Sequence, residues 1–262
     1  MNKWIKRSLL VALFPALVIA NAQSPLEQVD WLLYQGQFRQ AEQALEQVPP
    51  TDDNRVELGL YQARILLAER RLDEADEIIS AIKQQSPKDA RVYFWLGRIK
   101  GAQAQEASIF SAASYAKESK TAFLTSTQLD PTYVQGFQGL IQYYLRAPSF
   151  VGGSVEKAKQ TAHSLVKLDE LEGTLSLLSI AREEDDDKET ARLIEELNRK
   201  FADSNAAQLA IGYHYQAQEQ FDQAFVAFKH AASLEPKETT SALEKRRFND
   251  TKLNALYQIG RT

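Results

Sequence analysis

The chain has 262 residues, of which 44% are hydrophobic and 25% charged, so it can bury a core and hold one elongated or two compact domains. It has no cysteine, which excludes disulfides, thiolate metal sites and cysteine nucleophiles. Its formal net charge of −4 argues against a nucleic-acid partner, because such binding depends on neutralising phosphates.

Residues 1–22 have the pattern of a secretory signal peptide. Three basic residues come first, an apolar stretch runs from Ser8 to Ala20, and the small residues Ala20 and Ala22 precede the expected cleavage before Gln23. The alternative is a retained membrane anchor, but Pro15 interrupts a stretch that is short of the about 20 apolar residues a span needs.

Cleavage would remove three positive charges and lower the formal net charge from −4 to −7. Without cysteine the protein has no lipidation site, so we expect a periplasmic or secreted protein of a Gram-negative bacterium, with no membrane span after cleavage and no lipid anchor.

The stretch from Asn205 to Pro236 contains the pattern that the rest of the chain repeats. Its first half has apolar or small residues at helical spacing, a polar turn follows from Gln218 to Gln220, and its second half has another apolar face. The residues concerned are Leu209, Gly212 and Tyr215, and then Phe221, Ala224, Phe228 and Ala231. Two such helices form a hairpin that needs neighbours to bury its faces.

Copies of this hairpin recur along the chain. A step of 34 residues leads from Phe38, Ala41 and Leu45 to Leu72, Ala75 and Ile79, which have the same classes in the same order. Further copies begin at Tyr93 and near Phe137, and a weaker one runs from Leu177 to Phe201. This period and the Leu-Gly, Tyr, Ala, Phe, Ala and Pro positions resemble the tetratricopeptide repeat (TPR) family.

The resemblance implies an all-α, right-handed α-solenoid of about six helix-turn-helix repeats over residues 23–236. Residues 237–262 are predicted to form a capping helix up to Thr251, which includes Lys245, Arg246 and Arg247, and then the first helix of a partial seventh repeat from Leu253.

Two copies are longer than the period. The third has ten extra residues around 101–115, for which we predict two lengthened helices that project beyond the stack, with a partner-binding element as the alternative. The fourth has five extra residues, in which Gly152 and Gly153 form a turn and Ser154 caps the next helix. This turn lacks the lysine and the preceding strand of a phosphate-binding loop.

No catalytic or metal-binding constellation is recognisable. His163 lies in one repeat and His214 and His230 in another, without a third ligand at metal-site spacing, and the acidic run 183–187 lacks the glycine and distal glutamate of a calcium loop. We therefore expect a protein that is not an enzyme and needs no cofactor, with the acidic run forming a solvated turn.

The concave wall of such a solenoid is lined by the first helix of each repeat, and this wall is the predicted binding surface. If the register holds, Arg64, Arg98, Gln142 and Tyr213 occupy matching places on it, with Arg91, Phe94, Gln138, Arg146 and Leu209 as neighbours. Arginines 34 residues apart suit a peptide that carries a carboxylate.

The sequence thus predicts an adaptor that binds a peptide or helix of another protein, and a role in envelope or surface-structure assembly is one expectation. The first alternative is a structural subunit of a larger envelope complex that contacts partners through residues 101–115. The second is a hydrolase with an unrecognised site.

Overall fold

Thirteen α-helices and one short 3₁₀ helix make up the described part of the computed structural model, residues 25–236 and 242–261, and no strand occurs in it. The predicted signal peptide lies outside these residues. The first helices of the successive pairs are α1 (Pro25–Tyr34), α3 (Arg55–Ala68), α5 (Ala90–Glu106), α7 (Val134–Arg146), α9 (Glu170–Glu183) and α11 (Asn205–Ala217). The second helices are α2 (Phe38–Glu46), α4 (Leu72–Gln85), α6 (Ile109–Leu129), α8 (Val155–Leu168), α10 (Asp187–Lys200) and α12 (Phe221–Ser233), and α13 (Ala242–Ile259) follows alone.

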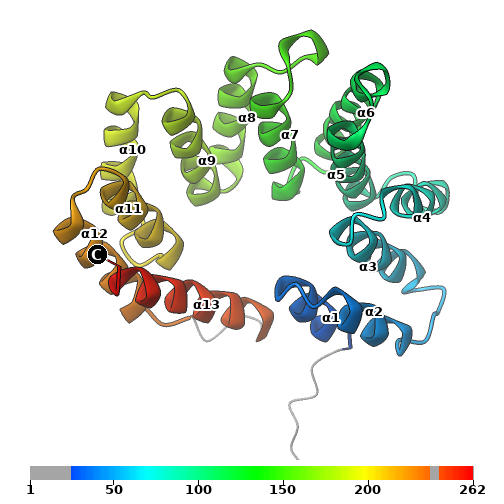
Figure 1. Ribbon diagram of the computed structural model, residues 1–262, viewed down its shortest axis with the longest axis horizontal. Helices are drawn as coiled ribbons and strands as arrows, with labels where there is room; N and C mark the ends of the chain where they lie inside the picture. Colours follow the sequence, from blue (N-terminus) through cyan, green and yellow to red (C-terminus); the bar gives the residue numbers. More distant parts are fainter. Residues whose placement is uncertain (1–24, 237–241, 262) are drawn as a thin grey trace, which may run out of the picture.

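The pairs form an arc in which each pair stacks on the next (Figure 1). This confirms the predicted all-α solenoid of six hairpins. The last helix, α13, packs against α11 and α12 and also contacts α1, so the two ends of the arc meet.

Tight turns inside the hairpins repeat the same backbone conformation. Gly36, Arg70, Asp185 and Glu219 have φ values of 71°, 63°, 54° and 59°, the left-handed conformation that ends a helix and reverses the chain. They occupy the same place in the first, second, fifth and sixth pairs. The turns of the third and fourth pairs are the ones that carry insertions.

The insertions take the form predicted for them. In the third pair, α5 has 17 residues and α6 has 21, against 14 in α3 and α4, so both helices are lengthened. In the fourth pair, the turn contains the 3₁₀ helix η1 (Ser149–Val151), and Gly152 follows with φ of 100°. Ser154 then caps α8 by accepting a hydrogen bond from the Lys157 amide at 3.3 Å.

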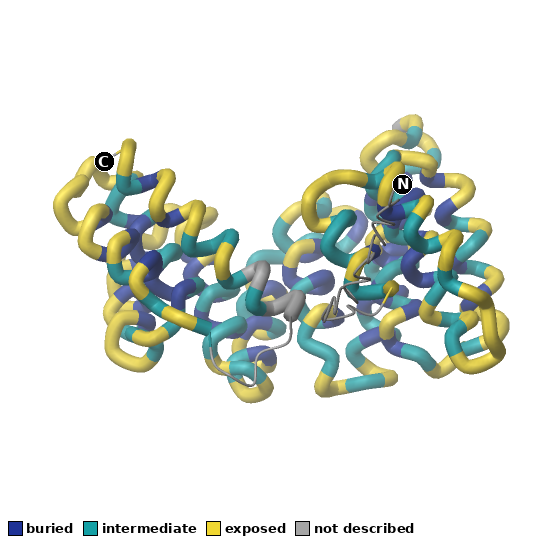
Figure 2. The backbone as a smooth tube through the Cα atoms, turned by 90° about the horizontal axis from the view of Figure 1, so that it is seen from below, coloured by how far each residue is buried: buried dark blue, intermediate teal, exposed yellow. Residues whose placement is uncertain are grey.

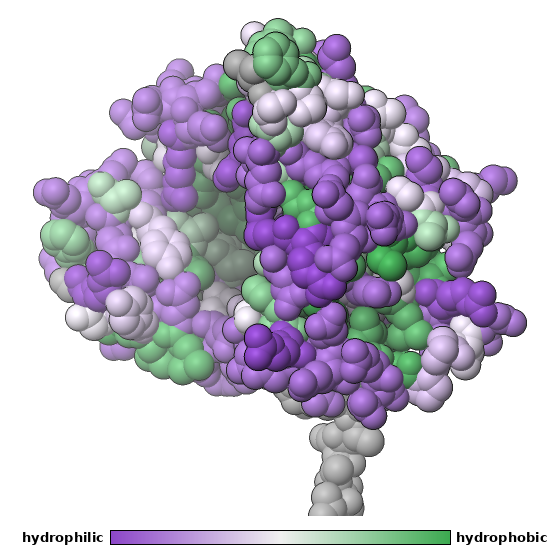
Figure 3. Space-filling view, turned by 45° about the vertical axis from the view of Figure 1, so that its right-hand side comes forward, coloured by the Kyte–Doolittle hydropathy of each residue, from purple (hydrophilic) through white to green (hydrophobic). Residues whose placement is uncertain are grey.

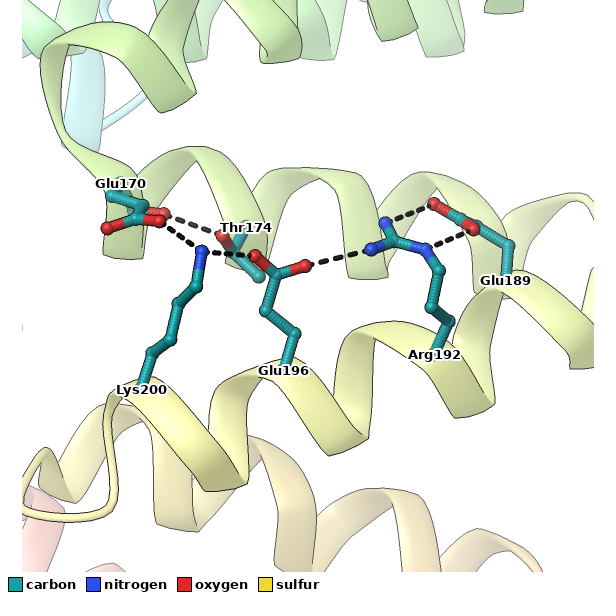
Figure 4. Close-up of polar contacts among 6 residues, drawn as sticks. All are labelled: Glu170, Thr174, Glu189, Arg192, Glu196 and Lys200. Atoms are coloured by element: carbon teal, nitrogen blue, oxygen red, sulfur yellow. Dashed lines mark hydrogen bonds and ion pairs between the residues drawn. The ribbon is translucent and has the colours of Figure 1, made fainter.

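The acidic run is an inter-helix turn, as predicted. Asp186 caps α10 by accepting a hydrogen bond from the Glu189 amide, and Glu184 forms an ion pair with Lys159 at 2.6 Å. A further row of ion pairs joins α9 to α10 at the surface, from Glu170 through Lys200, Glu196 and Arg192 to Glu189 (Figure 4).

The prediction for the C-terminal region was wrong in one respect. Instead of a capping helix and a separate half-repeat, residues 242–259 form one continuous helix. Neither glycine nor proline occurs between Ala242 and Ile259, so nothing breaks the helix. Ala255 is fully buried against Phe228, and this contact holds α13 on the sixth pair.

The core consists of the facing sides of the stacked helices, while the turns at the edges are exposed (Figure 2). Several of its close contacts place an aromatic ring on a glycine of a neighbouring helix. The Phe123 ring on α6 lies where a Cβ at Gly97 on α5 or at Gly139 on α7 would be, at 2.8 and 2.4 Å. The Phe228 ring lies in the same way against Gly212, at 2.4 Å. These glycines are needed because only a residue without a side chain lets the rings approach so closely.

We expect Phe123→Ala to lower the free energy of unfolding by about 3–5 kcal/mol, because it leaves a cavity between three helices. Urea denaturation followed by circular dichroism measures this. The matched control is Phe225→Ala, which removes a phenylalanine that is 40% exposed and should cost about 1 kcal/mol or less. Equal losses in the two variants would contradict the role given to Phe123.

Candidate binding surface

The first helices of adjacent pairs lie side by side and form one wall of the arc. Arg64 on α3 reaches Asp30 on α1 at 2.5 Å, and Gln138 on α7 donates to Glu172 on α9 at 2.9 Å. Arg182 on α9 donates to the main-chain carbonyl of Ala210 on α11 at 3.0 Å. The space-filling view shows the molecular surface hollowed, with apolar residues in the depth of the hollow (Figure 3).

Arg64 is held by the protein itself. Besides its ion pair with Asp30, its guanidinium lies 4.7 Å from the centre of the Tyr61 ring and 5.2 Å from that of Trp95. The Tyr61 hydroxyl donates to the other Asp30 oxygen at 2.7 Å. Burial and this hydrogen bond raise the pKa of Tyr61, so the hydroxyl stays protonated and Asp30 is shared between two donors. The group therefore ties the first repeat to the second.

Arg98 on α5 differs from Arg64 in having no carboxylate partner among the described residues. Its guanidinium lies 5.4 Å from the Trp95 ring centre and 5.9 Å from that of Phe94. Partial desolvation lowers the pKa of Arg98, and the charge of Arg64 lowers it further, although the residue is exposed on the surface. A side chain that is both accessible and partly desolvated is expected inside a concave surface.

The rings around these arginines complete the basic part of the wall. Trp95 contacts both Arg64 and Arg98, so it brings the two predicted arginines together. Tyr133 packs edge-on against Phe94 at 5.8 Å, and burial raises its pKa to about 12 against the opposing charges of Arg91 and Arg64. Several groups with affinity for anions thus meet on α3, α5 and the start of α7.

Other predicted residues are placed as follows. Arg91 is exposed but forms an ion pair with Asp89 at 2.6 Å, which raises the pKa of Arg91. Gln142 and Arg146 are exposed on α7, one turn apart, and the Arg146 Nε donates to Gln142 at 3.2 Å. Gln138 is occupied by Glu172, whose pKa is raised mainly by burial.

Three predicted residues are not open on the wall. Phe94 is only 7% exposed and packs in the core against Phe123 and Tyr133, because α6 and α7 cover that side of α5. Leu209 and Tyr213 pack against the cluster around Phe228, and the Tyr213 hydroxyl donates to Asn254 of α13 at 3.0 Å. The chain's own last helix therefore occupies this end of the predicted surface.

Sequence reasoning missed Trp95, Tyr133 and Arg182. Trp95 and Tyr133 stand next to predicted residues in the sequence or in space, but only the helix orientations reveal their contacts. The sequence does contain a signal that could have identified Arg182: it lies in the last turn of the first helix of its pair, as Arg146 does in α7. Burial lowers its pKa, as it does for Arg98.

The histidines and acids do not assemble a metal site in the described part of the chain. His214 is nearly buried, and its pKa is lowered by burial and then by Arg182, so the ring is neutral near pH 7. No helix in the described ranges combines the length and the apolar character needed to cross a bilayer.

Comparison with known proteins agrees with this architecture. Residues 32–94 match the profile of the tetratricopeptide repeat family, and this match together with the six stacked hairpins supports assignment of the chain to the TPR superfamily. No curated protein matches the sequence.

Several solved structures align with most of this chain at low identity. A thermophilic TPR protein of Thermus thermophilus has 16% identity and a TM-score of 0.48, covering 89% of this chain and 97% of that one. A TPR protein of Parabacteroides merdae has 12% identity and a TM-score of 0.45, covering 88% and 97%. A human IFIT1 dimer with PPP-AAAA has 16% identity and a TM-score of 0.46, covering 78% of this chain and 52% of that chain. Likenesses at this level indicate nothing about ligands.

We expect Asp30→Ala to loosen the first repeat, because it leaves the half-buried Arg64 without a carboxylate and the Tyr61 hydroxyl without an acceptor. The free energy of local opening over residues 25–46 should fall by about 1–3 kcal/mol. Amide hydrogen exchange resolved by mass spectrometry measures it. Asp52→Ala is the control, since it breaks an ion pair with Arg55 at the exposed surface. Unchanged exchange at α1 and α2 in Asp30→Ala would show that the pair does not hold the repeat.

Proposed function

We propose that the protein is a periplasmic or secreted adaptor that binds an acidic segment of another protein in the hollow of its solenoid, without a cofactor. TPR folds generally mediate protein–protein interaction, and this fold provides the wall. The observation that carries the proposal is the exposed Arg98, a cation that lies over the Phe94 and Trp95 rings and has no carboxylate partner among the described residues.

The chemistry favours an anionic ligand at Arg98. A carboxylate that approaches Arg98 forms a charge-assisted hydrogen bond with it and offsets its repulsion by the nearby Arg64. A charge-assisted hydrogen bond of this kind contributes about 1.5–3 kcal/mol. The Trp95 ring beside it provides an apolar surface for the neighbouring part of the segment.

The remaining wall residues suggest how the segment would continue. Gln142 and Arg146 are exposed on the next first helix, α7, and Arg182 follows on α9. A segment that crosses α5, α7 and α9 would meet an arginine on each. It would end before Tyr213, because α13 covers that position.

The compartment follows from the N-terminal pattern of three basic residues, an apolar stretch and small residues before Gln23. Within the envelope, a carrier or assembly factor that holds a polypeptide segment needs only a binding surface. A role in envelope or surface-structure assembly is therefore part of the proposal.

A second candidate is favoured by the lengthened hairpin of the third pair. Because α5 and α6 project beyond the stack, the protein would act as a structural subunit that contacts a larger complex through residues 101–115. The two candidates are distinguishable by substitution. Changing the wall arginine Arg98 abolishes binding if the protein is an adaptor, and changing residues 101–115 abolishes it if the protein is a structural subunit.

We expect a random peptide library selected on the purified protein to yield peptides with acidic side chains or an essential C-terminal carboxylate. Arg98→Gln should weaken the binding of the selected peptides about tenfold or more, corresponding to the loss of one charge-assisted bond. Fluorescence polarisation measures the affinities. Arg55→Gln serves as the control because Arg55 is exposed and ion-paired with Asp52. Enrichment without acidic groups, or equal binding by Arg98→Gln, would refute the anionic site.

Processing provides a separate test. After expression in a Gram-negative host, the protein from the periplasmic extract should have the intact mass of a chain that begins at Gln23. Ala22→Arg should block cleavage and retain the chain in the membrane fraction, because signal peptidase requires a small residue there. Recovery of uncut wild-type protein would contradict export by this route.

A further inference from the structure

The two insertions share a feature that the concave wall does not explain. Each exposes a phenylalanine, Phe110 at the start of α6 with 93% of its surface accessible and Phe150 in η1 with 77%. Each lies in an uncharged stretch, residues 107–116 and 147–155, although a quarter of the whole chain is charged. Bare aromatic rings on uncharged protrusions are unusual for a surface that faces only water.

Both insertions lie at the same edge of the solenoid. The first helices run side by side, so the turns that follow them lie along one edge. Arg70 in the turn of the second pair donates through Nε to Glu106 at the end of α5, at 2.7 Å. Lys120, in the middle of α6, donates to the Val151 carbonyl in the turn of the fourth pair at 3.4 Å. The loop between α7 and α8 stands out from the stack in Figure 1.

Three lysines near these rings have no carboxylate partner among the described residues. Lys117 and Lys120 follow Phe110 along α6, and Lys120 contacts the loop of Phe150. Lys157 lies 5.9 Å from the centre of the Tyr144 ring, just after that loop. This edge is therefore basic, in a chain whose net charge is negative.

Two of the acidic groups nearby are paired with other cations. Glu118 pairs with Lys100 at 3.3 Å, and Glu106 with Arg70. Glu156 accepts a hydrogen bond from the neutral Gln160 at 2.9 Å and keeps its charge, so it offsets only part of the charge of the three lysines. The lysines can thus meet an external anionic surface.

We infer that this edge, defined by Phe110, Phe150, Lys117, Lys120 and Lys157, binds the surface of an anionic lipid bilayer. Aromatic side chains insert between the headgroups, and lysines beside them are attracted to anionic lipids. Phe110 and Phe150 are too exposed to lie in a groove that could hold a partner helix, whereas a bilayer can surround an inserted ring. Binding is peripheral and leaves the concave wall open.

The absence of cysteine allows one dye to be placed at the tip. Ser111→Cys, labelled with a polarity-sensitive dye, reports the environment next to Phe110 in the full chain. Asp222→Cys at the start of α12, an exposed site in the sixth pair, two pairs beyond the insertions, is the control position. The labelled protein is titrated with vesicles of phosphatidylethanolamine that contain about one-third phosphatidylglycerol. A separate titration uses vesicles of phosphatidylcholine alone.

We expect the dye at position 111 to shift to shorter emission wavelengths on the anionic vesicles, and the dye at position 222 not to shift. Phe110→Ala with Phe150→Ala should raise the lipid concentration at half-binding about tenfold, because the rings provide the inserted apolar surface. Phe225→Ala with Val226→Ala, which removes exposed apolar side chains from α12, should leave it unchanged. Lys117→Glu with Lys120→Glu should weaken binding, and so should high salt.

No emission shift at position 111, an equal shift at position 222, or equal shifts on both kinds of vesicle would overturn the inference. So would unchanged binding by the Phe110/Phe150 variant. Circular dichroism confirms that each variant is folded. Arg98→Gln should bind vesicles as the wild type does, so a failure of the proposed peptide site and a failure of this lipid site are distinguishable.

Discussion

The close approach of neighbouring helices, made by aromatic rings lying on glycines, is the contact on which the rest of the structure depends. Phe123 lies against Gly97 of its own pair and Gly139 of the next, so one side chain couples two repeats. Phe228 joins α11 to α12 in the same way, and its cluster includes Ala255 of α13. Because each hairpin is packed so closely on its neighbour, the first helices are held in a fixed order along the wall.

That order determines which charges meet. Asp30 forms an ion pair with Arg64 and accepts a hydrogen bond from the Tyr61 hydroxyl. These contacts hold the first repeat on the second and leave Arg64 without a free charge to offer a ligand. One repeat further on, the equivalent Arg98 lies over two aromatic rings and has no carboxylate partner in the described part of the chain. The same register that makes the wall therefore leaves Arg98 without a carboxylate among the described residues, and this difference from Arg64 supports the proposed binding of an acidic segment.

Two surfaces with different chemistry result from one stack. The inner wall has arginines beside aromatic rings, whereas the edge of the third and fourth pairs has exposed phenylalanines and lysines. The contact between α13 and α1 brings the ends of the arc together and limits the wall to the middle repeats. A protein arranged in this way could hold a polypeptide segment while resting on a lipid surface.

The sequence by itself determined the helix pairs, their number, the lengthened third hairpin and the nature of the acidic and glycine turns, because all of these depend on local spacing and turn chemistry. It also placed Arg64 and Arg98 near each other, since a 34-residue period carries one position onto the next. Only the tertiary structure decided that Phe94 is buried, that Trp95 lies beside both arginines and that α13 covers Tyr213. These outcomes depend on the rotation of each helix and on contacts between segments distant in the chain, which a repeat pattern does not encode.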